Sequence, residues 1–176
     1  MKQLAQPTTL LMLCALLIPL LLNAQKDPIK WGKVSEKDLK MTVYEADTTA
    51  DALVLADYAT LDFDFSSGEA RYVFHRHRRI KILKRSGFKY GDISISVFND
   101  DKISGLKAQA ISPNGEEYKV KKSEIYEEET TDKWSRTKFS FPQITEGAVL
   151  EYEYSLNSGD FFNLERWYFQ DYIPVR

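Results

Sequence analysis

The sequence predicts a mainly β protein, an antiparallel β-sandwich of about eight strands with one short N-terminal helix. Apolar and polar residues alternate with a period of two along several segments, as expected when alternate side chains face a core. Clusters of Gly, Pro, Asn and Asp separate these segments at short intervals. The chain also holds 10 Tyr, 10 Phe and 3 Trp, and aromatic residues favour strands over helices.

The first segment, residues 1–24, has the order of a secretory signal peptide. Lys2 precedes an apolar run from Leu10 to Leu22, and Ala24 supplies a small residue before a polar start. About 13 apolar residues fall short of the roughly 20 that span a membrane, which disfavours an uncleaved anchor. We therefore expect cleavage after Ala24 and a protein exported to the periplasm or the extracellular face of a bacterial envelope, with no stable membrane span.

Residues 25–50 are predicted to form an extended leader followed by a short helix. Pro28 and Gly32 interrupt regular structure at the start of this segment. Ser35 is a typical N-cap residue, and the acidic Asp38 follows three positions later, which predicts one or two helical turns.

Residues 51–176 carry the period-two alternation and are predicted to form the β-sandwich, folding with the leader as one unit. Residues 112–115, Ser-Pro-Asn-Gly, form a strong turn signal because Pro and Asn-Gly occupy favoured turn positions. The acidic segment 123–132 is interpreted as a solvated helical turn or loop. Strands are expected over residues 54–65, 71–84, 92–98, 103–111, 117–121, 137–141, 148–156 and 161–172.

Composition excludes several classes of function. The single Cys, Cys14, lies inside the predicted signal peptide, so the mature chain would lack disulfides, thiolate metal ligands and a Cys nucleophile. The formal net charge of −2 at pH 7 argues against a dedicated nucleic-acid-binding protein, which normally carries a basic surplus. No cofactor motif is present, and we expect none to be bound.

The most concentrated group of chemically active side chains is the run from His75 to Arg79. On a strand, His75, His77 and Arg79 would share one face, opposite Arg76 and Arg78. Two imidazoles at this spacing could hold a metal ion, although the neighbouring cations would repel it. The favoured interpretation is a solvated strand face whose cations pair across the sheet with acidic residues.

Other residues could contact a ligand or partner, but none forms a catalytic motif. No Ser lies in a Gly-x-Ser-x-Gly elbow, and Glu151 and Glu153 have the spacing of an exposed strand face. The final aromatic segment is interpreted mainly as a strand buried on both faces, with carbohydrate binding as an alternative role. The residues retained as contacts to a ligand, a glycan or a partner are Arg79, Trp134, Trp167 and Tyr168.

Several stretches in a fixed order resemble a known family. They are residues 31–39, 51–56, 77–83, 103–110, 139–142 and 167–170, ending with Trp167-Tyr-Phe-Gln170 and then Pro174-Val175. Together they are similar to domain-of-unknown-function family 3857, the N-terminal β-domain of transglutaminase-like bacterial envelope proteins.

The resemblance implies a β-domain that precedes a transglutaminase-like domain, whose Cys, His and Asp would act as a peptidase or amidase. Because the mature chain has no Cys, no catalytic residue is carried over to it, and we expect this chain to lack the catalytic domain, as a fragment or a stand-alone version. The sequence therefore predicts an exported, non-catalytic interaction module with a transglutaminase-like domain or an envelope protein as partner. The alternatives are a carbohydrate-binding module and a small metal-dependent enzyme centred on His75 and His77.

Overall fold

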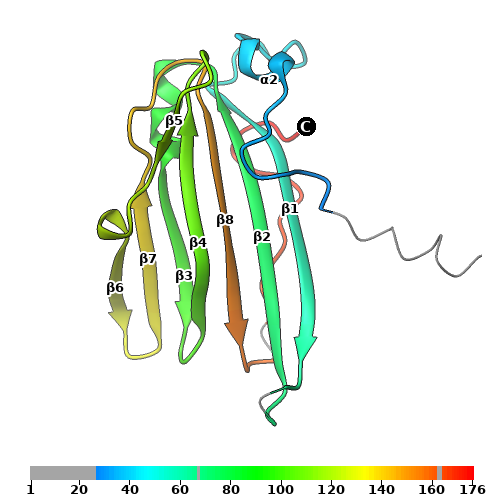
Figure 1. The fold of residues 1–176 in the computed structure, drawn as a ribbon, viewed down its shortest axis with the longest axis vertical. Coiled ribbons are helices and arrows are strands. Elements are labelled where there is room, and N and C mark those ends of the chain that lie inside the picture. The colour runs from blue at the N-terminus through cyan, green and yellow to red at the C-terminus, as the bar shows by residue number, and fades with distance from the viewer. Residues whose placement is uncertain (1–26, 67, 162–163) are drawn as a thin grey trace, which may run out of the picture.

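The computed structural model describes residues 27–66, 68–161 and 164–176. It confirms the mainly β fold, with eight strands arranged in two antiparallel sheets (Figure 1). The predicted signal peptide, residues 1–24, and its cleavage site after Ala24 lie outside the described residues. Within the part of the chain that is described, no helix is both long enough and apolar enough to cross a membrane.

The larger sheet has five strands in the order β1-β2-β8-β4-β5, and the smaller sheet has three in the order β3-β7-β6. The strand bounds are β1 Ala52–Asp64, β2 Arg71–Ile82, β3 Asp92–Phe98, β4 Lys102–Ile111, β5 Glu117–Lys119, β6 Tyr126–Thr131, β7 Trp134–Ser140 and β8 Val149–Ser158.

The predicted N-terminal helix is present as α2, Glu36–Lys40. The Ser35 hydroxyl oxygen accepts a hydrogen bond from the backbone N–H of Asp38 at 3.1 Å, as its N-cap role requires. Two 3-10 helices, η1 Arg85–Gly91 and η2 Lys122–Glu124, complete the regular structure.

Two of the predictions of secondary structure were wrong. The acidic segment 123–132 is mostly strand β6, which pairs with β7 in a register that places Glu128 opposite Arg136. Cations on β7 therefore offset the like charges that made this segment resemble a solvated loop. The expected strand over residues 161–172 is absent from its described part, residue 161 and residues 164–172, and most of that part is exposed.

The main core lies between the two sheets. Ile95 and Val97 of β3 and Phe139 of β7 pack against the even-numbered residues of β8, such as Leu150 and Tyr152. This face of the larger sheet is called the inner face below. The smaller sheet does not cover all of it, and the chain after β8 runs behind β1 and β2, as Figure 1 shows.

The opposite, outer face of the larger sheet is covered by the leader, which crosses in front of β1 and β2 in Figure 1. A second, smaller apolar cluster lies on this side, formed by Leu53, Leu83 and Val149 among others. Val34 and Leu39 of the leader pack against it. Both faces of β2 are therefore covered, which determines the environment of its charged residues.

Candidate functional site

The charged centre of β2 divides between the two faces as the alternation predicts. Arg76 and Arg78 lie on the inner face, and His77 and Arg79 contact residues of the leader on the outer face. The interpretation of one face as solvated was wrong, because His77 and Arg79 are only 3% and 6% exposed. The leader that covers them is distant in the sequence, so alternation alone could not show the coverage.

On the inner face, two arginines bind two aspartates. Arg76 donates two hydrogen bonds to Asp57, from Nε at 2.8 Å and from Nη2 at 2.6 Å. Arg78 pairs with Asp171 of the C-terminal segment, and its Nε lies 3.4 Å from Asp57 Oδ2. Burial raises the pKa of Asp171, but the hydrogen bonds from Arg78 and from the backbone N–H of Tyr172, together with the charges of Arg78 and Arg76, more than offset this, so the pKa lies below its ordinary value.

These arginines anchor the segment that follows β8. The ring of Trp167 lies 5.3 Å from the Arg76 guanidinium carbon, within the range of a cation–π contact. Ile173 is buried in the main core, and the backbone at Pro174 accepts a hydrogen bond from Val54 of β1 at 2.9 Å. The segment is thus held at several points without forming a strand.

Residues 164–173, called the aromatic segment below, present large apolar side chains to solvent. Tyr168, Phe169 and Tyr172 are 67%, 84% and 98% exposed, and Leu164 is 46% exposed. Large apolar side chains gathered in one short exposed segment are typical of interaction sites. The prediction that these residues are mostly core was therefore wrong.

Of the four residues predicted to contact a ligand or partner, the structure brings two together. Trp167 and Tyr168 both belong to the aromatic segment. Trp134 lies on β7 in the smaller sheet, half exposed, with its ring 4.8 Å from that of Phe98. Arg79 is buried on the outer face and cannot meet a partner while the leader covers it.

Sequence reasoning missed Leu164 and Asp171, and it considered Phe169 and Tyr172 for an aromatic platform but did not retain them as contacts. A signal was available, because the apolar residues from 161 to 173 occur at positions 161, 162, 164, 167, 168, 169, 172 and 173, which do not fit a period of two. A segment with this irregular spacing cannot bury its apolar side chains as a strand does.

The two histidines do not form a metal site with the residues around them. His75 Nδ1 lies 3.2 Å from the Ser155 hydroxyl, and His77 Nε2 lies 2.8 Å from Glu151. Among the described residues, no three His, Cys, Asp or Glu side chains are arranged to hold a metal ion. The expectation that Glu151 and Glu153 lie on an exposed face was wrong, because Glu151 is fully buried and the Glu153 side chain is 18% exposed.

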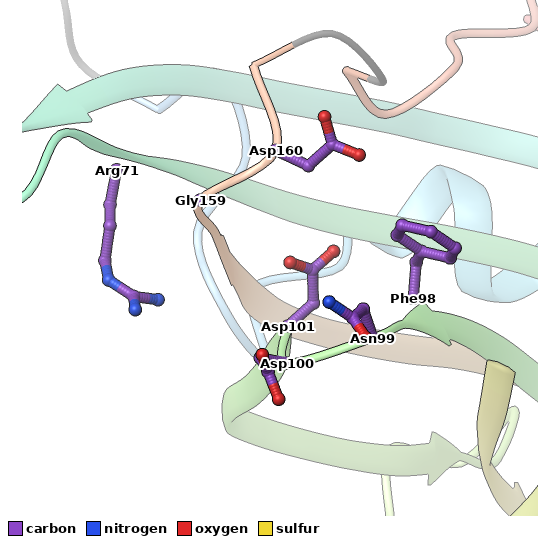
Figure 2. A pocket seen from close by; sticks show the side chains of 7 residues that line it. All are labelled: Arg71, Phe98, Asn99, Asp100, Asp101, Gly159 and Asp160. Carbon is purple, nitrogen blue, oxygen red and sulfur yellow. The ribbon is translucent and has the colours of Figure 1, made fainter. Parts of the chain in front are cut away.

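A cleft of about 360 Å³ lies between the β3–β4 turn and the end of β8. Figure 2 shows Asp100, Asp101 and Asp160 gathered around Gly159, with Arg71 to one side. Burial raises the pKa of Asp101, and a hydrogen bond with Ser158 offsets this only in part. The lining of the cleft is acidic, with three aspartates and one arginine.

Comparison with known proteins agrees with this fold. A family described as a Domain of Unknown Function with solved structure, DUF3857, matches residues 68–176. The chain belongs to the DUF3857 family. No curated protein matches it significantly.

One solved structure, described as a "putative protease" from Parabacteroides distasonis, is similar with a TM-score of 0.54 and 12% identity. The similarity covers 61% of this chain but only 23% of the other. At this identity the likeness establishes only a shared β fold, and it concerns less than a quarter of the longer protein.

Proposed function

We propose that this DUF3857 chain is an exported, non-catalytic interaction module that binds a protein partner through its aromatic segment, residues 164–173. The proposed partner is a transglutaminase-like domain of a bacterial envelope protein. The observation that carries the proposal is the exposure of Leu164, Tyr168, Phe169 and Tyr172 on a segment that is anchored at Trp167 and Asp171.

The surroundings of the segment favour a protein over a glycan as the ligand. Sugar recognition needs hydrogen-bonding groups beside the aromatic rings to fix the orientation of the ligand. Here the nearby charged groups of Arg76, Arg78, Asp57 and Asp171 bind one another. The charged groups that anchor the segment are thus already engaged, and its exposed apolar side chains suit an apolar protein surface.

The proposal that the chain is not an enzyme is supported by how its reactive side chains are used. His77 lies between the carboxylates of Glu151 and Glu153, at 2.8 and 3.5 Å, and it is buried beneath the leader. Among the described residues, the serine that contacts a histidine is Ser155, which lies 3.2 Å from His75 and not beside the carboxylate-bound His77, so these groups do not form a Ser-His-carboxylate arrangement. These side chains therefore act as structural partners in our proposal.

A binding experiment tests the proposal directly. The purified full chain is titrated against an immobilised transglutaminase-like domain, and the double substitution Tyr168→Ser with Phe169→Ser should weaken binding at least about tenfold, as loss of interface hot spots does. The matched control, Tyr126→Ser with Trp134→Ser, removes two exposed aromatic side chains from the smaller sheet and should leave binding unchanged.

Three outcomes would contradict the proposal. They are equal binding by the aromatic-segment variant and the control, saturable quenching of Trp fluorescence by envelope glycans with no protein binding, and hydrolysis of peptides or amides by the purified chain.

A further inference from the structure

The outer face of the larger sheet holds buried charged side chains that bind the backbone of the leader. The relevant part of the leader, residues 27–34, is called the strap below. No residue of the strap is fully buried, and Val34 is its one residue that packs against an apolar cluster, so apolar burial contributes little to holding the strap in place. The contacts that hold the strap are therefore mainly polar, and most of them come from Glu151 and Arg79.

Glu151 is the centre of this set. One of its oxygens, Oε2, accepts hydrogen bonds from the backbone N–H of Gly32 at 2.8 Å and from Gln109 Nε2 at 2.9 Å. The other, Oε1, lies 2.7 Å from Arg79 Nε and 2.8 Å from His77 Nε2. The carboxylate of Glu151 is fully buried, and one of its four hydrogen-bond partners comes from the strap.

Arg79 binds the strap from the same position. Its guanidinium donates to the carbonyl oxygen of Lys33 at 2.9 Å and to that of Lys30. Arg79 and Glu151 therefore recognise one N–H and two carbonyl groups within four consecutive residues. Hydrogen bonds that involve charged groups in a dry environment are strong and directional.

Trp31 supplies the one large side chain of the strap that the sheet recognises. Its ring lies 4.4 Å from Lys107 Nζ and 5.8 Å from the centre of the His77 ring. Gly32 follows with φ of +69°, a left-handed conformation that residues with a Cβ rarely adopt. Lys30 and Lys33 are exposed, so only their backbones are bound.

We propose that Glu151, Arg79, His77, Gln109 and Lys107 form a peptide-binding socket for a Trp-Gly segment, which the strap occupies in cis and which can exchange for the same segment supplied in trans. The buried Oε1 of Gln109 has no hydrogen-bond partner among the described residues, so the strap leaves one acceptor of the socket unused. Covalent attachment gives the strap an effective concentration in the millimolar range, which is sufficient to hold a weakly bound segment.

The structure also indicates why the strap can leave without unfolding the domain. The main core lies on the inner face, and the second apolar cluster is covered by residues that begin at Val34 and continue through α2 to Tyr44. Residues 27–33 contribute to neither cluster. Their release is a local opening, which requires far less free energy than global unfolding.

The test separates the strap from the rest of the chain and supplies it again as a free peptide. A protease site is inserted between Val34 and Ser35, the full chain is cut, and the released fragment is removed by gel filtration. A fluorescein-labelled peptide of residues 27–34 should then bind the cut chain saturably by anisotropy, at least about tenfold more tightly than it binds the uncut chain. Circular dichroism and thermal unfolding confirm that the cut chain stays folded.

Variants of the peptide identify what the socket recognises. Gly32→Ala in the peptide should weaken binding about tenfold because of its positive φ, and Trp31→Ala should weaken it similarly. The double substitution Lys30→Ala with Lys33→Ala should bind like the native peptide in high salt, since both side chains are exposed. In the cut chain, Glu151→Gln should abolish saturable binding, whereas the exposed control Glu129→Gln should not.

The proposal is overturned if the folded, cut chain shows no saturable peptide binding, or if cutting alone unfolds the sheet. It is also overturned if the alanine substitutions at Lys30 and Lys33 weaken binding as much as that at Gly32. Loss of binding at the aromatic segment would leave this result unchanged, so the two proposals can fail separately.

Discussion

At the scale of single residues, Glu151 should make stability depend on acid pH. Burial raises its pKa, but the hydrogen bonds from His77, Gln109 and Gly32 and the charge of Arg79 lower it more. The folded pKa therefore lies below the unfolded value near 4.5, so the stabilisation is complete above that value and is lost as pH falls through the folded pKa.

Glu151→Gln should therefore destabilise the protein by about 3–5 kcal/mol at neutral pH, because it leaves the Arg79 charge buried without its partner. The difference in the free energy of unfolding between this variant and the wild type should become smaller as pH falls. Urea unfolding at a series of acid pH values measures it, with Glu129→Gln as an exposed control expected to change stability by less than about 0.5 kcal/mol. A difference in the free energy of unfolding that stays constant with pH would contradict the lowered pKa of Glu151 in the folded protein.

Lys81 should make the stability of the protein depend on alkaline pH. Burial lowers its pKa from 10.5 to about 8, although its ammonium group donates to the carbonyl oxygens of Leu39, at 2.8 Å, and Gly147. Between these two values the unfolded chain binds the proton more readily than the folded chain, so the free energy of unfolding should rise as pH increases from about 8 toward 10.5. In Lys81→Met this increment should disappear, and an unchanged alkaline profile would contradict the prediction.

At the scale of elements, the close approach of η1 to the start of β1 should make Gly87 sensitive. A Cβ built on Gly87 would lie 2.4 Å from the backbone oxygen of Asp51, so the backbone must shift. Gly87→Ala should destabilise the protein by roughly 2 kcal/mol or more. Gly159→Ala is the control, because a Cβ at that position meets nothing within 4 Å. Thermal unfolding compares the two, and equal midpoints would show that η1 can move freely.

Strand β6 is a free edge of the smaller sheet, and its acidic residues should keep it from pairing with other chains. All six of its residues are exposed. Charged edge residues are a common defence against edge-to-edge association. The double substitution Glu127→Val with Glu129→Val should cause association that increases with concentration in sedimentation velocity, while Glu45→Val, outside any strand, should not. A monomeric double variant would show that another feature protects this edge.

The sequence predicted the elements well where burial follows the alternation. In β8, Leu150, Tyr152 and Tyr154 alternate with Val149, Glu151 and Glu153, and the structure places the first set in the main core. Alternation could not show that the second set is covered as well, because the donor to Glu151 from Gly32 lies 119 positions away. The prediction for the aromatic segment failed for another reason, because the apolar residues are irregularly spaced and the chain reaches the open edge of β1 only at Val175, opposite Val54.

At the scale of the whole molecule, the last residues connect the larger sheet to α2. The backbone N–H of Val54 donates to Pro174 at 2.9 Å, and the N–H of Arg176 donates to Val54 at 3.0 Å, which extends the edge of β1. The Arg176 side chain binds Asp38 of α2 at 2.6 and 3.2 Å and lowers the pKa of that carboxyl. One short stretch therefore joins the edge of the sheet to the helix that precedes it.

Deleting residues 174–176 should speed hydrogen exchange of the Val54 amide by at least about tenfold, because it loses its acceptor, and should also increase exchange within α2. Arg176→Ala keeps the backbone pairing and removes only the ion pair, so it should increase exchange in α2 and leave Val54 protected. Exchange measured residue by residue on both variants distinguishes the two links. Continued protection of Val54 after the deletion would mean that the edge of β1 is stable without the parallel pairing to residues 174–176, and would contradict this prediction.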